Sequence, residues 1–356
     1  MTPQRVVWSE GMLVSPQHFQ QSDLYHENLV ACRLAAFSPC SWGVRALDLD
    51  AGALASEQVR IGRFQGVLPD GTYLAFQAGD AEAPASRAIG PHFAPAQPVL
   101  EVFLALPKQR QGGASIAPEN GAPTESSRAR FRATSRTVTD LAGDGAEVCV
   151  AFAQRNVSIL LGDEPADDFD TLKIAEIARN PSGGLILHES FIPPLLSCSA
   201  SPYLMANLRR LLALVTAKQR KLAQERQQRE AASVEFGAHE VTRYLQLAAL
   251  NTMLPFLVHA SRAGEISAHE LYLFLIRMVG QLATMASDID PTDVTVFSFA
   301  DLRATFEPLF GLLDGMLRSS VRGACLPVPV EVRDGVHLAL LNDERVVKSA
   351  QFILAA

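Results

Sequence analysis

Two histidines and a glutamate near the start of the chain are the first side chains able to hold a metal ion. His18 and His26 lie eight positions apart, and Glu27 follows directly. A metal site needs three or four convergent ligands, and the HEXXH pattern that places two histidines on one helix face is absent. We therefore favour ordinary buried or hydrogen-bonded histidines here.

The acidic segment GDEPADDFD at 162–170 carries the oxygen ligands that calcium prefers. It lacks the D-x-[DN]-x-[DN]-G spacing of a calcium loop, so a solvated loop is the favoured interpretation. The signatures GxSxG, GxGxxG and GxxxxGK[ST] are absent too, which removes the common nucleophile and phosphate sites. The sequence therefore predicts no catalytic residue, no cofactor and no metal, and a protein that is not an enzyme.

Three arginines alternate in RARFRATSR at 128–136 and suggest a charged face. A strand would place Arg128, Arg130 and Arg132 on one side and Phe131 on the other. Such a face could meet an acidic partner or a phosphate. A solvated edge strand, guarded by its charge, is the favoured interpretation.

The charge of the chain argues against nucleic acid as its partner. It has 31 basic and 38 acidic residues, a formal charge of −7, whereas phosphate binding needs a basic face. The most basic helical segment, KQRKLAQERQQRE at 218–230, is interrupted by Glu225 and Glu230, and Glu225 is placed to pair with Arg229. We interpret it as a solvated helix end.

Cysteines and apolar runs indicate the compartment. Five separated cysteines without a CxxC pattern favour neither a disulfide framework nor a zinc knuckle, and fit a reducing cytoplasm. No basic segment followed by an apolar one opens the sequence, so we expect no signal peptide. Runs such as LLALV at 211–215 are far shorter than the roughly 20 residues that span a bilayer, so we expect no direct membrane insertion.

Residues 40–190 have the pattern of short strands. No long helical pattern alternates with them, which predicts a β-sandwich rather than a parallel α/β sheet. Turn residues such as Pro69-Asp70-Gly71 separate the segments, and the polar segment 107–127 is predicted to be a loop. The β-forming segments are VRIGRF (59–64), TYLAF (72–76), VLEVFLAL (99–106), EVCVAF (147–152) and VSILL (157–161).

From Ser201 the apolar period becomes helical. Ser201-Pro202 is an N-cap followed by a first-turn proline, and Ser267 opens a capping box. Four amphipathic helices are predicted, forming a bundle or sharing a seam with other chains. Their stripes are Leu204, Leu208, Leu211, Val215 and Leu222; Val241, Leu245 and Ala248, with Leu250 a further candidate; Leu271, Leu275, Met278, Leu282 and Met285; and Leu302, Phe306, Leu309, Leu313 and Met316.

The end of the sequence returns to β pattern. LPVPVEV (326–332), Asp334-Gly335 and VHLALL (336–341) predict a β-hairpin. The segment is too short for an independent β domain. Either it packs on the helices, or the chain ends inside a third domain.

The opening of the chain carries a specific resemblance. It resembles the N-terminal signature of the TssK family, the baseplate subunit of the bacterial type VI secretion system. The signature stands here as Val6, Trp8, Glu10, Gly11, Met12, Val14, Pro16, Gln17, His18, Phe19, Gln20 and Gln21. Further matches follow in order at Trp42-Gly43, Leu68-Pro69-Asp70-Gly71-Thr72, Leu172-Lys173-Ile174-Ala175-Glu176-Ile177, Phe191-Ile192-Pro193-Pro194-Leu195, Ser201, Arg243-Tyr244-Leu245, Leu271-Tyr272 and Ala283-Thr284.

The resemblance implies an α+β multidomain chain. Residues 1–195 would form an N-terminal antiparallel β-sandwich shell domain, similar to the shoulder of phage receptor-binding proteins. Residues 196–322 would form a helical four-helix-bundle neck domain. Residues 323–356 would be a short C-terminal β segment, the start of a head domain that we expect to be truncated, because family members continue beyond this point.

The implied function is a non-enzymatic structural adaptor of the secretion baseplate. A homotrimer would link the TssF–TssG wedge, through its shell, to the cytoplasmic regions of TssL and TssM in the TssJ–TssL–TssM membrane complex, through its head. It would therefore lie in the cytoplasm at the inner face of the inner membrane. The alternative is a free-standing trimeric phage-like receptor or ligand-binding module, against which an aromatic content of 7% argues when the ligand is a sugar.

The signature supplies the predicted interaction residues. Large apolar side chains are plausible anchors, Gly11 and Pro16 are expected to fix a non-regular path, and His18 to hold backbone groups. A contact with the wedge, a sister subunit or the chain's own sandwich stays open. The predicted interaction residues are Trp8, Glu10, Gly11, Met12, Pro16, Gln17, His18, Phe19 and Gln20; the predicted neck-packing residues are Leu204, Leu208, Leu211, Val215, Leu271, Leu275, Leu282, Phe306 and Leu309.

Two positions depart from the family pattern. His269-Glu270 stands where the family usually has a proline after the histidine. Phe297-Ser298-Phe299 stands where a Tyr-x-His element is expected before Asp301. Both positions lie in the predicted neck, so we expect its details to differ from those of the family.

Overall fold

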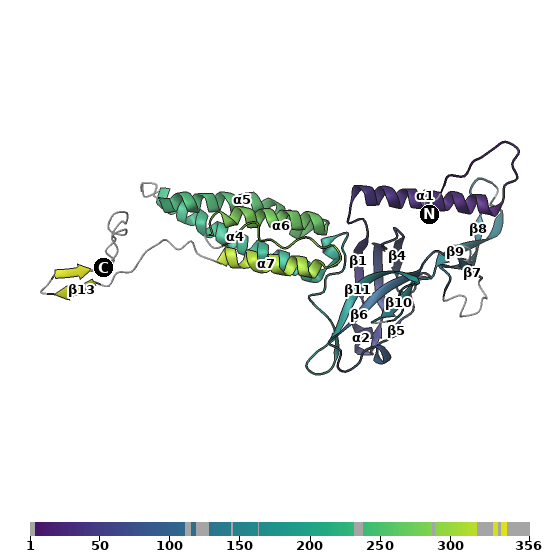
Figure 1. Cartoon of the computed structure of the whole chain (residues 1–356), viewed down its shortest axis with the longest axis horizontal. Coiled ribbons are helices and arrows are strands. Elements are labelled where there is room, and N and C mark those ends of the chain that lie inside the picture. The colour runs from purple at the N-terminus through teal and green to yellow at the C-terminus, as the bar shows by residue number, and fades with distance from the viewer. Residues whose placement is uncertain are drawn as a thin grey trace.

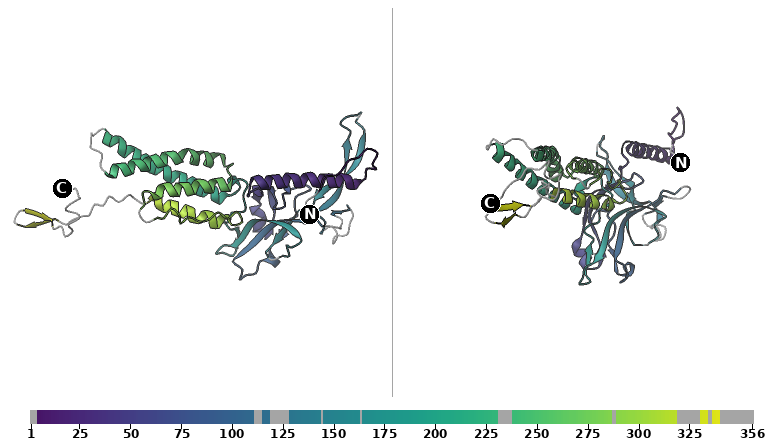
Figure 2. Two further views of the ribbon diagram at one scale, coloured as in Figure 1. Left: turned by 45° about the horizontal axis from the view of Figure 1, so that its top comes forward. Right: turned by 60° about the vertical axis from the view of Figure 1, so that its left-hand side comes forward.

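A computed structural model of the chain shows an elongated molecule in which sheets come first and helices follow (Figure 1). Two further views agree that the helices α4 to α7 lie at one end of the sheets (Figure 2). The described part contains six α-helices and mainly antiparallel sheets. The structure describes residues 4–110, 115–118, 128–143, 145–162, 164–230, 238–286, 289–318, 330–333 and 336–339.

Two antiparallel sheets share one apolar core. Their strand orders are β1-β3-β4 and β10-β6-β11-β12, and Phe64 of β3 stacks on Phe76 of β4 within that core. Each of the five segments predicted to be β contains a strand, which confirms that part of the prediction. The strands are β1 (Gly43–Leu49), β3 (Ile61–Val67), β4 (Tyr73–Gln77), β6 (Val99–Pro107), β10 (Ser158–Leu161), β11 (Phe169–Arg179) and β12 (Leu185–Leu187).

Short elements close the ends of these sheets. The N-cap Asp50 accepts hydrogen bonds from the backbone N–H groups of Gly52 and Ala53 (2.9 and 3.1 Å) and so starts α2. The short elements are α2 (Ala51–Ala55), the antiparallel pair β2 (Gln58–Val59) and β5 (Arg87–Ala88), and the 3-10 turns η1 (Gly90–His92) and η2 (Cys198–Ala200).

A two-stranded hairpin, which we call the arm, extends from the sheets (Figure 1). It consists of β8 (Phe131–Thr139) and β9 (Glu147–Arg155), paired antiparallel over their whole length. Near its root, β8 also pairs in parallel with β7 (Ile116–Ala117). The loop predicted at 107–127 is thus wrong at β7, where Ala117 is buried; much of the remaining segment lies outside the described residues.

The long helix α1 (Pro16–Phe37) was missed by the sequence analysis. Pro16 does not fix an irregular path, because it occupies the first turn of this helix, directly after the N-cap Ser15. None of its residues is buried, so α1 has no apolar stripe of the kind that reveals a core helix. It runs beside the sheets, along the long axis of the molecule (Figure 1).

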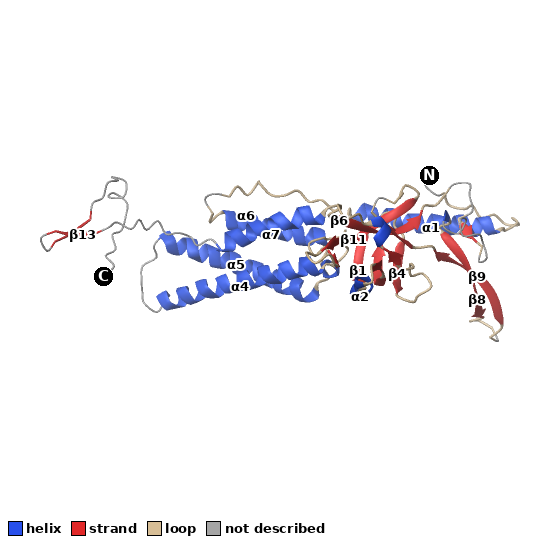
Figure 3. Ribbon diagram, turned by 90° about the horizontal axis from the view of Figure 1, so that it is seen from below, coloured by secondary structure: helices blue, strands red, loops and turns tan. Residues whose placement is uncertain are grey.

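Four helices pack together in the second half of the chain (Figure 3). They are α4 (Pro202–Glu230), α5 (Ala238–Ala263), α6 (Ala268–Ala283) and α7 (Leu302–Arg318). The nine residues chosen as neck-packing positions are each at most 3% exposed. The predicted stripe of α5 is largely out of phase: Val241, Leu245 and Ala248 are exposed, whereas the further candidate Leu250 is buried, together with Met253 and Leu257. Beyond these helices, β13 (Val330–Arg333) pairs antiparallel with β14 (Val336–Ala339), as predicted, although the turn between them lies outside the described residues.

The helices are fixed to the sheets by backbone contacts at β1. Gly43 has a φ of +125°, and Val44 donates its N–H to the carbonyl oxygen of Pro194 (2.8 Å). After Pro194 the chain bonds to the loop before α6, since Cys198 donates its N–H to the carbonyl oxygen of Ile266 (2.9 Å). Two segments that resemble the family, Trp42-Gly43 and the one containing Pro194, therefore meet at this junction.

Aromatic rings reinforce the same junction. Trp42 meets Phe299 edge to face, with ring centroids 5.0 Å apart. Phe297 contacts both His269 and Tyr272, each with centroids 5.1 Å apart. The departure at 297–299 thus lies against His269, which directly precedes the other departure at Glu270.

We predict that Gly43→Ala strongly destabilises the chain. A Cβ atom there would lie 2.6 Å from the carbonyl oxygen of Pro194, in addition to the strain of positive φ. Gly79→Ala is the matched control, since its φ is +96° but no atom lies within 4 Å of the added Cβ. We expect Gly79→Ala to cost about 1–3 kcal/mol and Gly43→Ala to cost clearly more in urea unfolding. Equal losses would contradict the role of this close approach.

Candidate interaction surface

The N-terminal signature folds back on the first turn of α1, and we call residues 8–19 the hook. Gly11 takes a φ of +75°, and Met12 donates its N–H to the carbonyl oxygen of Ser9 (3.3 Å). His18 accepts a hydrogen bond from the backbone N–H of Ser15 at Nδ1 (3.1 Å) and contacts its hydroxyl (2.9 Å). His18 therefore holds a backbone group, as predicted, and closes a capping box.

Aromatic side chains of the hook gather on its outside. The ring of Trp8 lies 6.1 Å from that of His18 and 6.2 Å from that of Phe19, between centroids. Trp8 is nevertheless 53% exposed and Phe19 60% exposed. In this chain they are therefore not part of the core. Of the other predicted interaction residues, Glu10, Gly11, Pro16, Gln17 and Gln20 are exposed, while Met12 and His18 are partly covered.

An exposed stripe continues from the hook along α1. Its members recur every three or four residues, which places them on one face of a helix. Four are apolar and more than half exposed, and two are acidic and exposed. The stripe, which we call the α1 stripe, consists of Phe19, Asp23, Glu27, Val30, Leu34 and Phe37.

One close approach seats α1 on the sheets. Gly71, in the turn between β3 and β4, has a φ of +91°, and a Cβ added there would lie 2.6 Å from the Cβ of Ala31. Only glycine permits this distance. The family-like segment at 68–72 therefore includes the point where α1 touches the body.

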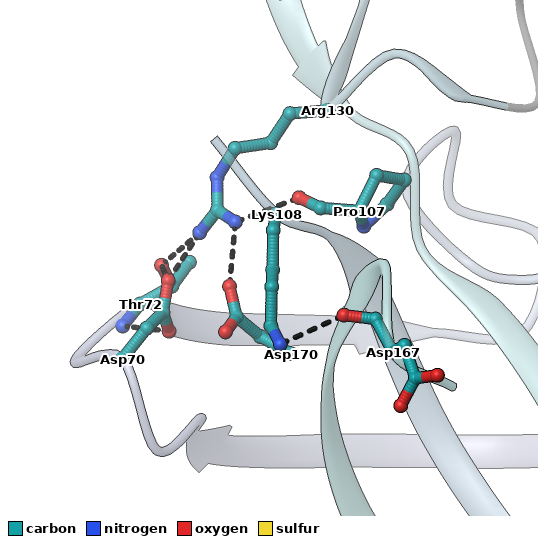
Figure 4. A network of polar contacts seen from close by, with 7 residues as sticks. All are labelled: Asp70, Thr72, Pro107, Lys108, Arg130, Asp167 and Asp170. Atoms are coloured by element: carbon teal, nitrogen blue, oxygen red, sulfur yellow. Dashed lines mark hydrogen bonds and ion pairs between the residues drawn. The ribbon is translucent and has the colours of Figure 1, made fainter. Parts of the chain in front are cut away.

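The same turn binds the root of the arm through Arg130, in an arrangement that we call the clasp (Figure 4). The guanidinium group donates to Asp170 Oδ2 (2.9 Å), to Thr72 Oγ1 (2.7 Å) and to the carbonyl oxygen of Pro107 (2.8 Å), and it also pairs with Asp70. The Arg130 side chain is only 7% exposed. Arg130 is thus not part of a solvated charged face, which corrects the interpretation of 128–136. The strand β8 is covered by β7 only at Phe131 and Arg132, so its outer edge is free beyond that point, as the edge-strand interpretation expects.

Neighbouring contacts complete the root of the arm. Arg132 donates from Nε to Asn156 Oδ1 (2.8 Å), and Asn156 donates from its side chain to the carbonyl oxygen of Ala129 (2.9 Å). Lys108 donates to the carbonyl oxygen of Asp167 (2.8 Å) beside the clasp (Figure 4). The three elements that meet at the clasp are therefore the β3–β4 turn, the end of β6 and the start of β11.

The two carboxyl groups of the clasp have opposite pKa shifts. Burial alone would raise the pKa of Asp70, but hydrogen bonds from Thr72 and the charge of Arg130 outweigh it and hold that pKa below its ordinary value. Burial raises the pKa of Asp170, and the hydrogen bond from Arg130 offsets this effect only in part. One arginine therefore stabilises two carboxylates unequally.

Outside the clasp, the arm is exposed on both faces. Cross-strand partners share a face, so Arg132, Thr134, Arg136 and Val138 lie with Gln154, Phe152, Val150 and Val148. We call this the arm face. Its Arg136 guanidinium stacks over the Phe152 ring, 4.4 Å from the centroid. The other face carries mostly small side chains, among them Ala133, Ser135, Ala151 and Ala153.

Charged side chains in the acidic segment 162–170 and the basic segment 218–230 form ion pairs with other parts of the chain. In the acidic segment, Glu164 pairs with Arg87 (2.6 Å) and Asp168 with Arg110 (3.2 Å), so it is not merely a solvated loop. In the basic segment, Glu225 pairs with Arg243 on the next helix (3.4 Å). Within the described residues no group of three or more His, Cys, Asp or Glu side chains is placed to hold a metal ion.

Comparison with known proteins shows which family the chain belongs to. Residues 18–356 match the family described as "Bacterial Type VI secretion, VC_A0110, EvfL, ImpJ, VasE". The chain is also 31% identical, over 354 residues, to the type VI secretion system baseplate component TssK1 of Pseudomonas aeruginosa, covering 98% of this chain and 77% of that protein. The chain belongs to the TssK family. This family consists of structural baseplate components rather than enzymes, in agreement with the prediction.

Solved structures of TssK share the fold. A crystal structure of TssK matches with a TM-score of 0.81 and 25% identity, over 97% of this chain and 76% of that one. A chain of a baseplate complex from the type VI secretion system matches with a TM-score of 0.82 and 25% identity, over 98% of this chain and 77% of that one. A chain of a TssK–TssF–TssG baseplate subcomplex matches with a TM-score of 0.76 and 25% identity, over 89% of this chain and 99% of that one. None of the helices that the structure describes is long and apolar enough to cross a membrane.

We predict that Arg130→Met costs about 3–5 kcal/mol of unfolding free energy at pH 7, because it leaves two half-buried carboxylates without a cation. Without Arg130 both pKa values rise, and a group with a raised pKa loses its stabilising effect as the pH rises through it. The loss should therefore be smallest near pH 4 and below. Urea unfolding at several pH values measures this.

Arg110→Met is the control for the clasp. It removes an ion pair with Asp168 whose side chains are 45% and 73% exposed, so we expect it to cost less than about 1 kcal/mol. If Arg130→Met were as mild as this control, or equally costly at every pH, the clasp would not stabilise the root of the arm.

Proposed function

We propose that this chain is a non-enzymatic structural adaptor of the type VI secretion baseplate. As a homotrimer it would join a TssF–TssG wedge to the cytoplasmic regions of TssL and TssM in the TssJ–TssL–TssM membrane complex. It would act in the cytoplasm, at the inner face of the inner membrane. The proposal is supported by family membership and by the likeness to a TssK chain from a complex with TssF and TssG.

The same proposal assigns a role to each part of the fold. Residues 1–195, with the two sheets, would be a β-sandwich shell, and residues 196–322, with α4 to α7, a four-helix-bundle neck. Residues 323–356, mostly outside the described part, would begin the head. The close backbone approach at Gly43, which joins the sheets to the helices, suits a protein that links two assemblies.

The observation that carries the proposal is the exposed hook. Monomeric soluble proteins rarely present adjoining large apolar side chains over a wide area, and such patches mark protein interfaces. Trp8 and Phe19 are of the types that anchor interfaces, and both are held by a local backbone structure rather than by a core. A predicted contact of the hook with the wedge or with a sister subunit fits this arrangement.

We expect the double variant Trp8→Ala, Phe19→Ala to weaken assembly at least about tenfold, because interface anchors of this size contribute 2 kcal/mol or more. Its unfolding free energy should change little, since both side chains are more than half exposed. Light scattering coupled to gel filtration, on the chain alone and mixed with a cognate TssF–TssG wedge, measures both contacts.

Tyr73→Ala is the matched control, since it removes another aromatic side chain that is 50% exposed, on β4. A wild-type chain that stays monomeric and does not co-elute with the wedge would refute the proposed function. If the double variant assembled like the wild-type chain, the hook would not be an interaction surface in the proposed function.

A further inference from the structure

Two uncovered surfaces of this chain match one another in chemistry and size, and neither is covered by the chain itself. They are the α1 stripe and the arm face. We propose that the arm face of one copy packs on the α1 stripe of the next copy, so that the contact closes a ring. This inference rests on the homotrimer of the proposed function and specifies which surfaces form it.

The arm leaves apolar side chains uncovered in the single chain. Beyond β7 it is a two-stranded ribbon, and such a hairpin is at best marginally stable alone in water. Its apolar side chains are nevertheless exposed: Val148 at 62%, Val150 at 38% and Phe152 at 37%. A further layer across this face would remove them from water and supply the missing packing.

The α1 stripe offers such a layer. Phe19, Val30, Leu34 and Phe37 are each more than half exposed, although α1 as a whole is seated at Gly71. The stripe runs from Phe19 to Phe37, which are 18 positions apart, or about 27 Å at 1.5 Å per residue. Each arm strand has nine residues, or about 30 Å. The two surfaces are therefore equal in length.

Their charges are complementary. The arm face carries Arg132 and Arg136, while Glu147, the single acidic residue of β8 and β9, lies on the opposite face. The α1 stripe carries Asp23 and Glu27, and no ion pair involving either of them is found among the described residues. Arg33 of α1 lies about 120° around the helix from Glu27. An arginine face would thus meet an acidic one.

The geometry favours a second copy over contact within one chain. The arm points away from α1 when the molecule is seen from below (Figure 3), and both surfaces stay exposed in the single chain. Each copy carries one surface of each kind. A contact between unlike surfaces passes from copy to copy and is closed by a ring, such as a trimer.

Charge exchange tests the pairing. We expect Arg136→Glu and Glu27→Arg each to raise the concentration at which the trimer dissociates at least about tenfold, because each places like charges opposite one another. The double variant Glu27→Arg, Arg136→Glu should restore it to within about threefold of wild type. Arg63→Glu, on an exposed position of β3, makes the same charge change away from both surfaces and should have little effect. Light scattering over a dilution series of the full chain measures this.

The outcomes separate this inference from the proposed function. The pairing is supported if the trimer dissociates at higher concentration in both single variants and at close to the wild-type concentration in the double variant. A trimeric Arg136→Glu variant that no longer co-elutes with TssF–TssG overturns it, and assigns the arm to the wedge. An Arg136→Glu variant that assembles normally also overturns it, while the homotrimer stands. A wild-type chain that is monomeric at every concentration refutes the homotrimer, and the pairing with it.

Discussion

The positions of α1 and of the arm relative to the sheets depend on one turn, at residues 69–72. Its Asp70 and Thr72 hold the buried guanidinium of Arg130, and so fix the arm. Its Gly71 allows α1 to approach within a distance that no side chain would permit. A buried ion cluster is a weak source of net stability, but it is costly to break and has only one satisfactory geometry. Placement of the arm and of α1 relative to the sheets, rather than stability, is what this turn provides.

Sequence reasoning succeeded where a pattern has a local cause. The strands were visible because β-forming residues alternate between turn residues, and α6 because Ser267 caps it and its stripe is buried. It failed where the cause is tertiary. The helix α1 buries nothing, and in α5 the exposed Val241 and Leu245 imitate a core stripe, whereas the real one contains Met253 and, of the predicted candidates, only Leu250. Ser15-Pro16 was nevertheless a usable signal, of the same kind as the Ser201-Pro202 that was used.

The candidate surface shows the same division. The family signature and the large apolar side chains within it selected Trp8 and Phe19 as predicted anchors, and both are exposed in the structure. Sequence alone gave no means of linking Arg130 to Asp70, 60 positions earlier, or to Asp170, 40 positions later. Alternation suggested three arginines on one strand face, but β8 begins only at Phe131. Arg130 therefore stands just before the strand, at the root of the arm, where it is the centre of a buried cluster rather than a solvated charge.

The junction between sheets and helices completes this arrangement. Gly43 lies against Pro194, and Trp42 lies against Phe299 from the loop before α7, so β1 is joined to the helices through both backbone and side chains. His269, which directly precedes the departing Glu270, touches Phe297 there. Residues in contact with one another couple energetically, so a change at Phe297 is felt at His269 and Tyr272 as well. The junction therefore sets the helices relative to the interaction surface through backbone hydrogen bonds and ring contacts together.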